Sequence, residues 1–350
     1  MLVVRLDGAG DVLLAGPAIR AVARRGLVSV LCGPAGVEAA ALLPGVREVL
    51  EWSAPWIVSP APAVDAADLT DLVERVRSRA FSEAVVLTSF HQSPLPTALL
   101  LRLAGVPRIT GASVDYAGSL LNVRLVPGED LPEDIPEPER ALRIAGAAGF
   151  ALPADDAGGL AVSGSVELSP SVGRSLTGGR MPGEAPVVVL HPGAAVQARR
   201  WPSGHFARLA GLLDRAGCRV VVTGGPDERT LTALVAGSVG QDLGGATTLA
   251  QLADVLARAD ALVVGNTSAA HLAAAVGTPV VSLFAPVVPA TRWAPYRVPQ
   301  VLLGDQDAPC RDSRARTCPI AGHPCLSGVS PEKVLESVLE MVGHRAEVPA

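Results

Sequence analysis

A loop of small residues and arginines in the second half of the chain has the composition of a phosphate-binding site. It reads His-Pro-Gly-Ala-Ala at residues 191–195 and Arg-Arg-Trp-Pro-Ser at residues 199–203, after an apolar run. When a strand enters such a loop before a helix, backbone N–H groups can approach a phosphate, and guanidinium groups can bind its oxygens in pairs. The alternative is a surface arginine pair with Trp201 in the core, and the loop alone favours neither.

Two further strand ends in this half carry polar residues. Glu228 follows Thr-Gly-Gly-Pro-Asp, where a carboxylate can bind ribose hydroxyls, and Asn266-Thr267-Ser268 follow the apolar run 261–265. His271 comes next on an alanine-rich helical pattern, where a single histidine can also be a packed residue bonded to a carbonyl. Ligands of open α/β sheets bind outside the carboxyl ends of the strands, so we expect these ends to converge on one crevice.

Asp11 has the corresponding position in the first half, after the run 2–6 and a loop that contains Gly8 and Gly10. A carboxylate in a first helical turn can simply complement the helix dipole, and only its company with the other strand ends makes it a candidate for chemistry. The two glycines suggest a dinucleotide-binding motif. Its third glycine would fall on Leu13, and the next strand lacks the acid that would hold a ribose, which disfavours a nicotinamide site.

A second polar loop in the first half, at residues 89–94, also follows an expected strand. His91 and Gln92 offer contacts to hydroxyl groups, although a helix-capping loop is an equal alternative. Asp115, Tyr116 and Arg124 are further candidates that the sequence does not place.

Possible metal ligands gather near the end of the chain: Cys310, Cys318, His323, Cys325 and the Asp305-Gln306-Asp307 triplet. The spacing from Cys310 to Ser313 lacks the paired cysteines of a zinc ribbon. We therefore expect no metal site, and the sequence leaves the role of the three cysteines open.

Short apolar runs alternate with helical patterns, which is typical of a parallel sheet covered on both faces. In the first half, strands are expected at residues 2–6, 28–32, 84–88 and 108–111, and helices at 11–25 and 95–104. In the second half, strands are expected at 187–190, 219–223, 261–264 and 279–284, and helices at 203–216, 228–236 and 249–258. Each half is predicted to be a doubly wound α/β domain.

The chain of 350 residues is long enough for two such domains. Residues 151–186 are rich in Gly, Ser, Pro and Asp and predict a linker. We expect an N-terminal domain at residues 1–165 and a C-terminal domain at 166–329. A last segment, 330–350, begins with Ser330 as N-cap and Pro331 at the first position of a helix to about residue 342.

Charge and hydropathy exclude several classes of protein. The net charge is −5 and no segment carries a block of basic residues, which disfavours nucleic acid as a partner. The first residues do not have the pattern of a signal peptide, and polar residues, Gly and Pro interrupt the longest apolar stretch, 262–289. Five cysteines, an odd number, suit a reducing compartment. We expect a cytoplasmic globular protein without a transmembrane helix.

Taken together, these segments resemble family 9 glycosyltransferases, the ADP-heptose transferases of lipopolysaccharide core assembly, over nearly the whole chain. The residues that carry the resemblance are Arg5 through Gly10-Asp11-Val12 to Pro17, His191-Pro192-Gly193-Ala194, Arg199-Arg200-Trp201-Pro202, Gly224-Gly225-Pro226-Asp227-Glu228, Asn266-Thr267-Ser268 through His271 to Ala275, and the tail from Cys310 to Cys325 ahead of Ser330-Pro331-Glu332.

The resemblance implies a GT-B fold, in which two Rossmann-like doubly wound domains face a central cleft. It assigns the acceptor to the N-terminal domain and the donor to the C-terminal domain, with the last helix returning toward the N-terminal domain. Asp11 would be the general base for an acceptor hydroxyl that attacks the anomeric carbon opposite ADP, so that the configuration inverts. Arg199 and backbone N–H groups would stabilise the leaving diphosphate without an obligatory metal or cofactor.

By the same resemblance the donor-binding residues are Ala194, Ala195, Arg199, Glu228, Thr247, Asn266, Thr267, Ser268 and His271, and the acceptor-binding residues are Gly10, His91 and Gln92. Arg199 stands for a phosphate-binding lysine, Glu228 for a ribose-binding glutamate, and Thr247 for a residue that borders adenine. Three departures from the family pattern stand out: Asn266 replaces Asp, Ser268 replaces Gly, and the pair Ala194-Ala195 replaces hydroxyl residues. Asn keeps the hydrogen bonding of Asp but loses its charge. The resemblance implies an ADP-heptose donor, and these departures lie where its sugar and phosphates are expected, so the nucleotide is better indicated than the sugar.

The leading hypothesis is therefore a metal-independent transferase that uses an ADP-sugar and a hydroxyl acceptor, either a glycolipid or a small glycoside. Peripheral membrane contact is expected only if the acceptor is a lipid. The rival hypothesis is a non-catalytic module that binds ADP or a nucleotide-sugar, with Asp11 as a cap only. An NAD-dependent dehydrogenase is the third alternative.

Overall fold

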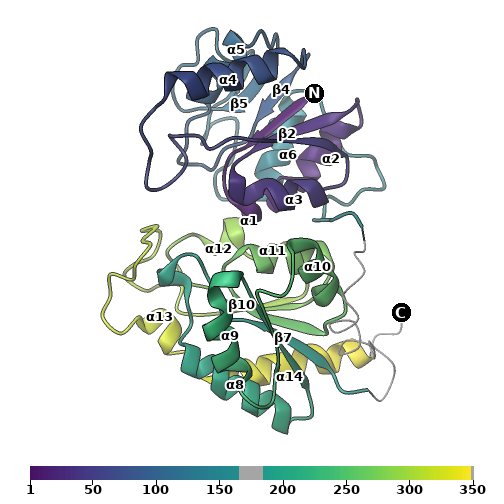
Figure 1. The fold of residues 1–350 in the computed structure, drawn as a ribbon, viewed down its shortest axis with the longest axis vertical. Coiled ribbons are helices and arrows are strands. Elements are labelled where there is room, and N and C mark those ends of the chain that lie inside the picture. The colour runs from purple at the N-terminus through teal and green to yellow at the C-terminus, as the bar shows by residue number, and fades with distance from the viewer. Residues whose placement is uncertain (165–183, 348–350) are drawn as a thin grey trace. The chain divides into compact units, whose positions relative to one another are not determined.

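The chain forms two compact units, Met1–Ser163 and Gly164–Ala350, in a computed structural model that describes residues 1–164 and 184–347 (Figure 1). Each unit contains a six-stranded parallel sheet with helices packed on it. The domain boundary expected between residues 165 and 166 and the glycine-rich part of the expected linker lie outside the described residues.

The sheet of the first unit has the strand order β3-β2-β1-β4-β5-β6, and all neighbouring strands are parallel. The strands are β1 Leu2–Arg5, β2 Val28–Cys32, β3 Val46–Glu51, β4 Ala84–Val86, β5 Ile109–Ala112 and β6 Val123–Leu125. The central strands are buried along their whole length because helices cover both faces, as the apolar runs predict. The chain reverses its direction across the sheet between β1 and β4, so their carboxyl ends form the switch point.

The first unit has one helical break that the sequence analysis did not predict. Its helices are α1 Ala9–Leu14, α2 Gly16–Ala23, α3 Val37–Leu42, α4 Ala66–Arg77, α5 Leu95–Leu103 and α6 Glu137–Ala147, with a short turn η1 Pro34–Gly36. The single helix expected at residues 11–25 is wrong, because the structure has α1 and α2 with Ala15 between them. Pro17 lies in the first turn of α2 and has no N–H for a bond to the preceding turn.

The second unit repeats the topology, with the order β12-β11-β10-β7-β8-β9. Its strands are β7 Val187–His191, β8 Arg219–Gly224, β9 Gln241–Gly244, β10 Ala261–Gly265, β11 Val280–Leu283 and β12 Gln300–Leu303. Its helices are α8 Ser203–Arg215, α9 Arg229–Ala236, α10 Leu249–Ala257, α11 Ser268–Ala275, α12 Ala290–Trp293, α13 Pro324–Ser327 and α14 Pro331–Glu347, with short turns η2 Gln197–Arg199 and η3 Pro226–Glu228. The switch point here lies between β7 and β10.

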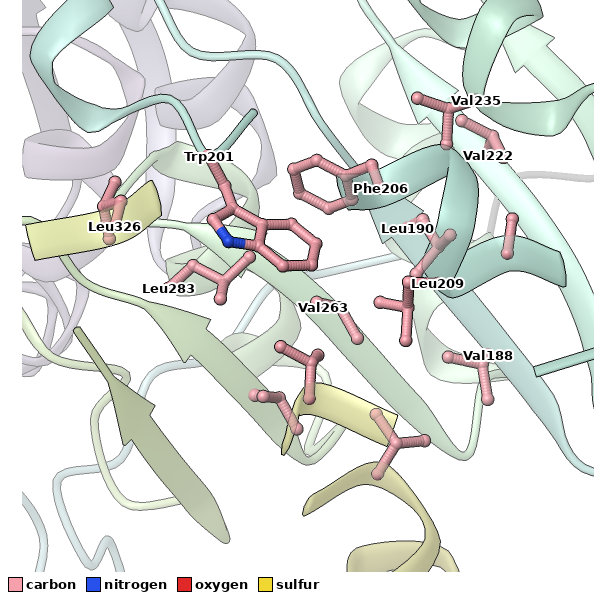
Figure 2. Close-up of a cluster of buried hydrophobic side chains, with 14 of the residues drawn as sticks. Val188, Leu190, Trp201, Phe206, Leu209, Val222, Val235, Val263, Leu283 and Leu326 are labelled. Carbon is pink, nitrogen blue, oxygen red and sulfur yellow. The ribbon is translucent and has the colours of Figure 1, made fainter. Parts of the chain in front are cut away.

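The core of the second unit is built around two aromatic residues of the arginine-containing loop and α8. Trp201 and Phe206 meet edge to face with their ring centroids 4.8 Å apart. Figure 2 shows Leu209 and strand residues such as Val263 beside them, and Leu326 of α13 on the other side of Trp201. The loop after β7 is therefore anchored in the core by its tryptophan.

The last helix begins as the sequence predicts, with Ser330 as its N-cap: the Lys333 N–H donates to Ser330 Oγ at 3.2 Å. It packs on α8 and against β10 and β11 of its own unit. We still predict that this helix returns toward the first domain. Among the described residues, no helix combines the length and the apolar character needed to cross a bilayer.

The core predicts a large difference between two leucines of the second unit. Leu209 on α8 is fully buried, whereas Leu234 on α9 is 58% exposed. Leu209→Ala should lower the free energy of unfolding by about 2–5 kcal/mol, because it removes buried methyl groups and leaves a cavity. Leu234→Ala should change it by less than about 0.5 kcal/mol. Urea unfolding followed by circular dichroism measures both, and equal losses would contradict this description of the core.

Candidate active site

The candidate site of the first unit is built on Arg5, the last residue of β1, whose guanidinium is buried among carboxylates. Its Nη2 lies 2.8 Å from Asp11 Oδ1, and its Nε lies 3.0 Å from Asp7 Oδ2. Glu137 of α6 lies 3.6 Å from Nη1, and Ser89 Oγ accepts a hydrogen bond from Nη2 at 2.9 Å. One guanidinium therefore holds acidic side chains from the β1–α1 loop, α1 and α6.

Burial and the charges of this cluster shift the pKa values of Arg5 and Asp7. Burial opposes the charge of Arg5, but the carboxylates of Asp7, Asp11 and Glu137 outweigh it and raise the pKa of the guanidinium. Burial raises the pKa of Asp7, aided by the negative charges of Asp11 and Glu137 and opposed by Arg5 and a hydrogen bond from Gln92. A buried acid with a perturbed pKa, such as Asp7, is common at functional sites.

The loop after β4 closes the other side of the switch point. Gln92 Nε2 donates to Asp7 Oδ1 at 2.5 Å, and Gln92 Oε1 accepts from the Ser89 N–H at 3.0 Å. Gln92 thus lies beside the acidic cluster, whereas His91 is exposed and makes an edge contact with Phe90 at 5.3 Å between ring centroids. Of the two residues of this loop that were predicted to meet the acceptor, the structure brings Gln92 to Asp7.

Asp11 lies in the first turn of α1, next to the half-buried Gly10, but it is not the N-cap residue. That residue is Gly8, and the Asp11 carboxylate accepts from Arg5. The side chains of Asp7, Asp11 and Glu137 are 12%, 27% and 2% exposed, respectively. Asp11 is therefore the acid of this cluster that a ligand can reach most easily.

In the second unit, Glu228 lies against the loop that follows β7. Its Oε2 accepts from the Gly225 N–H at 2.8 Å, which fixes the carboxylate at the end of β8. A Cβ atom at Gly193 would overlap this carboxylate, so only glycine leaves room for it. The ends of β7 and β8 thus converge, as the sequence analysis predicts.

His191, the last residue of β7, lies beside the end of β8. Its Nδ1 lies 3.0 Å from Thr223 Oγ1. Burial lowers the pKa of His191, although the negative charge of Glu228 opposes this shift. Ala194 is buried and Ala195 is exposed in the same loop, and Arg200 Nε donates to the Ala194 carbonyl at 2.7 Å. The lowered pKa of His191 leaves its imidazole neutral near pH 7.

Arg199 and the end of β10 meet at the second switch point. Arg199 is half-buried, and its Nη1 donates to the Asn266 carbonyl at 3.4 Å. A Cβ atom at Gly265 would lie 2.8 Å from the Arg199 carbonyl oxygen, so the two backbones approach as closely as glycine permits. The Asn266 side chain forms two long hydrogen bonds, both 3.4 Å, with the backbone N–H and C=O of Ala285. An aspartate could not donate to that carbonyl, which gives this departure a structural reason.

The other residues predicted for the donor lie around the same edge. Thr267 is the N-cap residue of α11, and its hydroxyl oxygen is buried with no hydrogen-bond partner among the residues the structure describes. Ser268 is half-buried at the start of α11 and His271 is buried one turn later. Thr247 is half-buried in the loop between β9 and α10. Backbone N–H groups and a hydroxyl at a helix start suit an anionic ligand.

Sequence reasoning missed Glu137 and Arg140, which come from α6. Arg140 is almost completely buried, and it donates to the Thr88 carbonyl at 2.7 Å and to Glu133 at 3.3 Å. The only signal was a pair of charged residues in a helical pattern, which normally marks a solvated face. Arg124 binds backbone carbonyls of residues 113 and 114, and Tyr116 is exposed.

The cysteines at the end of the second unit belong to its core. Cys310 and Cys325 are buried and Cys318 packs against the same cluster. Burial, followed by the neighbouring Cys310 and Cys318, raises the pKa of Cys325 to about 11. The thiol is therefore protonated at neutral pH and unreactive.

The sequence profile of glycosyltransferase family 9 (heptosyltransferase) matches residues 72–323. Lipopolysaccharide heptosyltransferase 2 of Escherichia coli K12 is 27% identical over 238 residues, which are 65% of this chain and 66% of that protein. Lipopolysaccharide heptosyltransferase 1 of Pseudomonas aeruginosa is 34% identical over 139 residues, which are 39% of this chain and 38% of that protein. The matched parts span between 33% and 66% of the curated relatives' own length.

Solved structures are similar over nearly the whole chain. ADP-heptose lps heptosyltransferase II of E. coli has a TM-score of 0.71 and 22% identity, with 98% of both chains covered. An E. coli heptosyltransferase with ADP-2-deoxy-2-fluoro heptose has a TM-score of 0.68 and 18% identity, and covers 97% of this chain and 98% of its own. These similarities and the two parallel-sheet units confirm the predicted GT-B fold class.

The family profile covers well over half of the sequence, including the loops after β7, β8 and β10, and the topology of both units agrees with it. The chain belongs to glycosyltransferase family 9, the heptosyltransferase family.

Proposed function

We propose that this protein is a glycosyltransferase that moves a sugar from an ADP-sugar to an acceptor hydroxyl, with inversion and without a metal ion, and that Asp11 is the general base. The observation that carries the proposal is the access of Asp11: it is 27% exposed, while the other acids on Arg5 are more deeply buried. Family membership supplies the reaction class.

In the proposed reaction, the acceptor oxygen bonds to the anomeric carbon as the bond from that carbon to ADP breaks. Asp11 takes the proton of the acceptor hydroxyl, and ADP leaves with the electron pair of the broken bond. Arg5 holds one oxygen of Asp11 at 2.8 Å and so orients the carboxylate before substrate arrives. Gly10 and Gln92, which lie next to Asp11 and Asp7, are proposed to contact the acceptor, as is the exposed His91.

The proposed donor site uses the switch point of the second unit. Arg199 and the start of α11, with the buried hydroxyl of Thr267, provide positive charge and donors for a diphosphate. Glu228 provides a fixed carboxylate for ribose hydroxyls. Ala194, Ala195, Thr247, Ser268 and His271 line the same edge in this proposal, with Thr247 bordering the adenine.

Heptose is the sugar we propose, because heptosyltransferases are the named relatives. Asn266 and Ser268 differ from the family pattern near the proposed sugar position, so the identity of the sugar has to be measured. Incubation with a panel of ADP-sugars and acceptors, with ADP release as the readout, identifies both substrates. ADP binding without release of ADP from any sugar would favour the rival, a non-catalytic nucleotide-binding module.

The role of Asp11 predicts a selective loss of turnover. Asp11→Asn should lower kcat by about 10²–10⁴-fold, because it removes the proton acceptor. The dissociation constant for ADP, measured by calorimetry, should stay within about twofold, because the variant leaves the second unit unchanged. Asp65→Asn is the control: Asp65 caps α4 by accepting from the Ala67 N–H, and asparagine also caps. If both variants keep full turnover, Asp11 is not the base and its carboxylate only complements the dipole of α1.

The contact between Gly193 and Glu228 predicts the effect of one added methyl group. Gly193→Ala should displace the Glu228 carboxylate and raise the dissociation constant for ADP by about 10- to 100-fold, the weight of one or two hydrogen bonds to a charged group. Glu228→Ala should give a similar loss. Gly204→Ala on α8 is the matched control, because an added Cβ there meets no atom within 4 Å. Unchanged ADP affinity in Gly193→Ala would argue against Glu228 as a ribose ligand.

The protonation of His191 predicts a pH dependence of stability. Its folded pKa is lowered by burial, so the unfolded chain binds a proton first as the pH falls below the ordinary histidine pKa of about 6.5. The stabilisation is present above that pH and is lost as the pH falls through it. The free energy of unfolding should therefore fall less steeply between about pH 7 and pH 5 in His191→Asn than in the wild type. Urea titrations at several pH values measure this, and identical slopes would refute the shift.

A further inference from the structure

The tail segment, residues 316–329, is tied by hydrogen bonds to the arginine loop, residues 196–201. The Ala198 N–H donates to the Arg316 carbonyl at 3.0 Å, and the Cys318 N–H donates to Gln197 Oε1 at 3.1 Å. Trp201 Nε1 donates to the Val329 carbonyl at 3.1 Å. The chain thus returns after more than a hundred residues to hold the loop that carries Arg199.

His323 makes the tie nearest to Arg199. Its Nε2 lies 3.1 Å from the Ala198 carbonyl oxygen, and because a carbonyl only accepts, Nε2 must carry the hydrogen. The backbone of His323 is left-handed, with φ of 51°, and its carbonyl accepts from the Leu326 and Ser327 N–H groups. The imidazole is therefore presented from a fixed turn at the start of α13.

Ala198 transmits this constraint to Arg199. Both polar groups of its backbone are bonded to the tail, its side chain is fully buried, and the next residue is Arg199. On the other side, the Arg199 carbonyl lies against Gly265 at the end of β10. The Ala198 peptide therefore links the tail directly to the backbone of Arg199.

We propose that His323 is a positioning residue of the donor site, which holds the Ala198 peptide so that Arg199 is aimed at the diphosphate of the donor. This inference rests on the proposed function, in which Arg199 binds phosphate. Gln197 and the tail backbone assist, and the tail segment of the family pattern thereby acquires a role in donor binding.

The test measures ADP affinity by calorimetry on the full chain. His323→Ala should raise the dissociation constant by about tenfold, the weight of one hydrogen bond and a small misplacement of a charged group. His323→Gln should restore most of the affinity, because its Nε2 can donate from nearly the same place. Ser327→Ala is the matched control, since the hydrogen bond of Ser327 Oγ among the described residues goes to the Gly322 carbonyl, within the tail. It should bind ADP as the wild type does.

A double-substitution cycle separates positioning from a general loss of structure. Arg199→Ala should weaken ADP binding, and adding His323→Ala to it should cause almost no further loss, because the two residues act through one contact. If the losses multiply, or if His323→Ala binds ADP normally while Arg199→Ala does not, the role of His323 is wrong and the proposed function stands.

If Arg199→Ala itself binds ADP normally, the proposed phosphate site fails and the inference falls with it. Thermal unfolding confirms that each variant is folded. Should His323→Ala not fold, Gln197→Ala carries the same cycle. In the part of the chain that the structure describes, the exposed Gln197 side chain accepts the bond from the Cys318 N–H and makes no other.

Discussion

In both units the fourth strand of the chain pairs with the first, on the side opposite the second and third strands. All strands are parallel, so every strand-to-helix loop leaves the sheet at the same edge, and the loops after the first and fourth strands diverge there. This constraint places Asp11 beside the loop of Ser89 and Gln92 in the first unit. In the second unit it places Arg199 against Gly265 and Asn266. The candidate residues of both units are gathered at these two switch points.

The first switch point contains an arrangement that stability alone does not favour. A guanidinium and several carboxylates are buried together, and removing such ions from water costs several kcal/mol before their attraction offsets it. Asp7 expresses this cost directly, because burial raises its pKa despite the adjacent Arg5. Arg140 and Glu133 extend the network toward Thr88. Buried charge of this kind is consistent with a site in which the orientation of Asp11 matters more than stability.

The second switch point is held by packing and by close backbone approaches. Glycine at positions 193 and 265 lets Glu228 and the Arg199 backbone come within contact of neighbouring loops. Trp201 anchors the arginine loop in the core, as Figure 2 shows, and its N–H reaches the tail at Val329. The Asn266 side chain hydrogen-bonds the backbone of Ala285, so this departure from the family pattern has a structural role in the loop after β11.

Sequence patterns determined the architecture of the buried strands, because a strand covered on both faces must be apolar along its length: the predictions for β1, β2, β7 and β10 are confirmed to within a residue. They also placed Glu228 and Asn266 at strand ends and Ser330 at a helix start. Among the elements that the sequence did not predict are the half-exposed strands β3 and β9 and the polar helices α4 and α6. Their sequences mix polar and apolar residues as loops do. Only the tertiary structure decided that Glu137 reaches Arg5 and that His323 reaches Ala198. These contacts join residues more than a hundred positions apart, and the physical reason is that no local propensity or spacing encodes a pairing that chain packing alone creates.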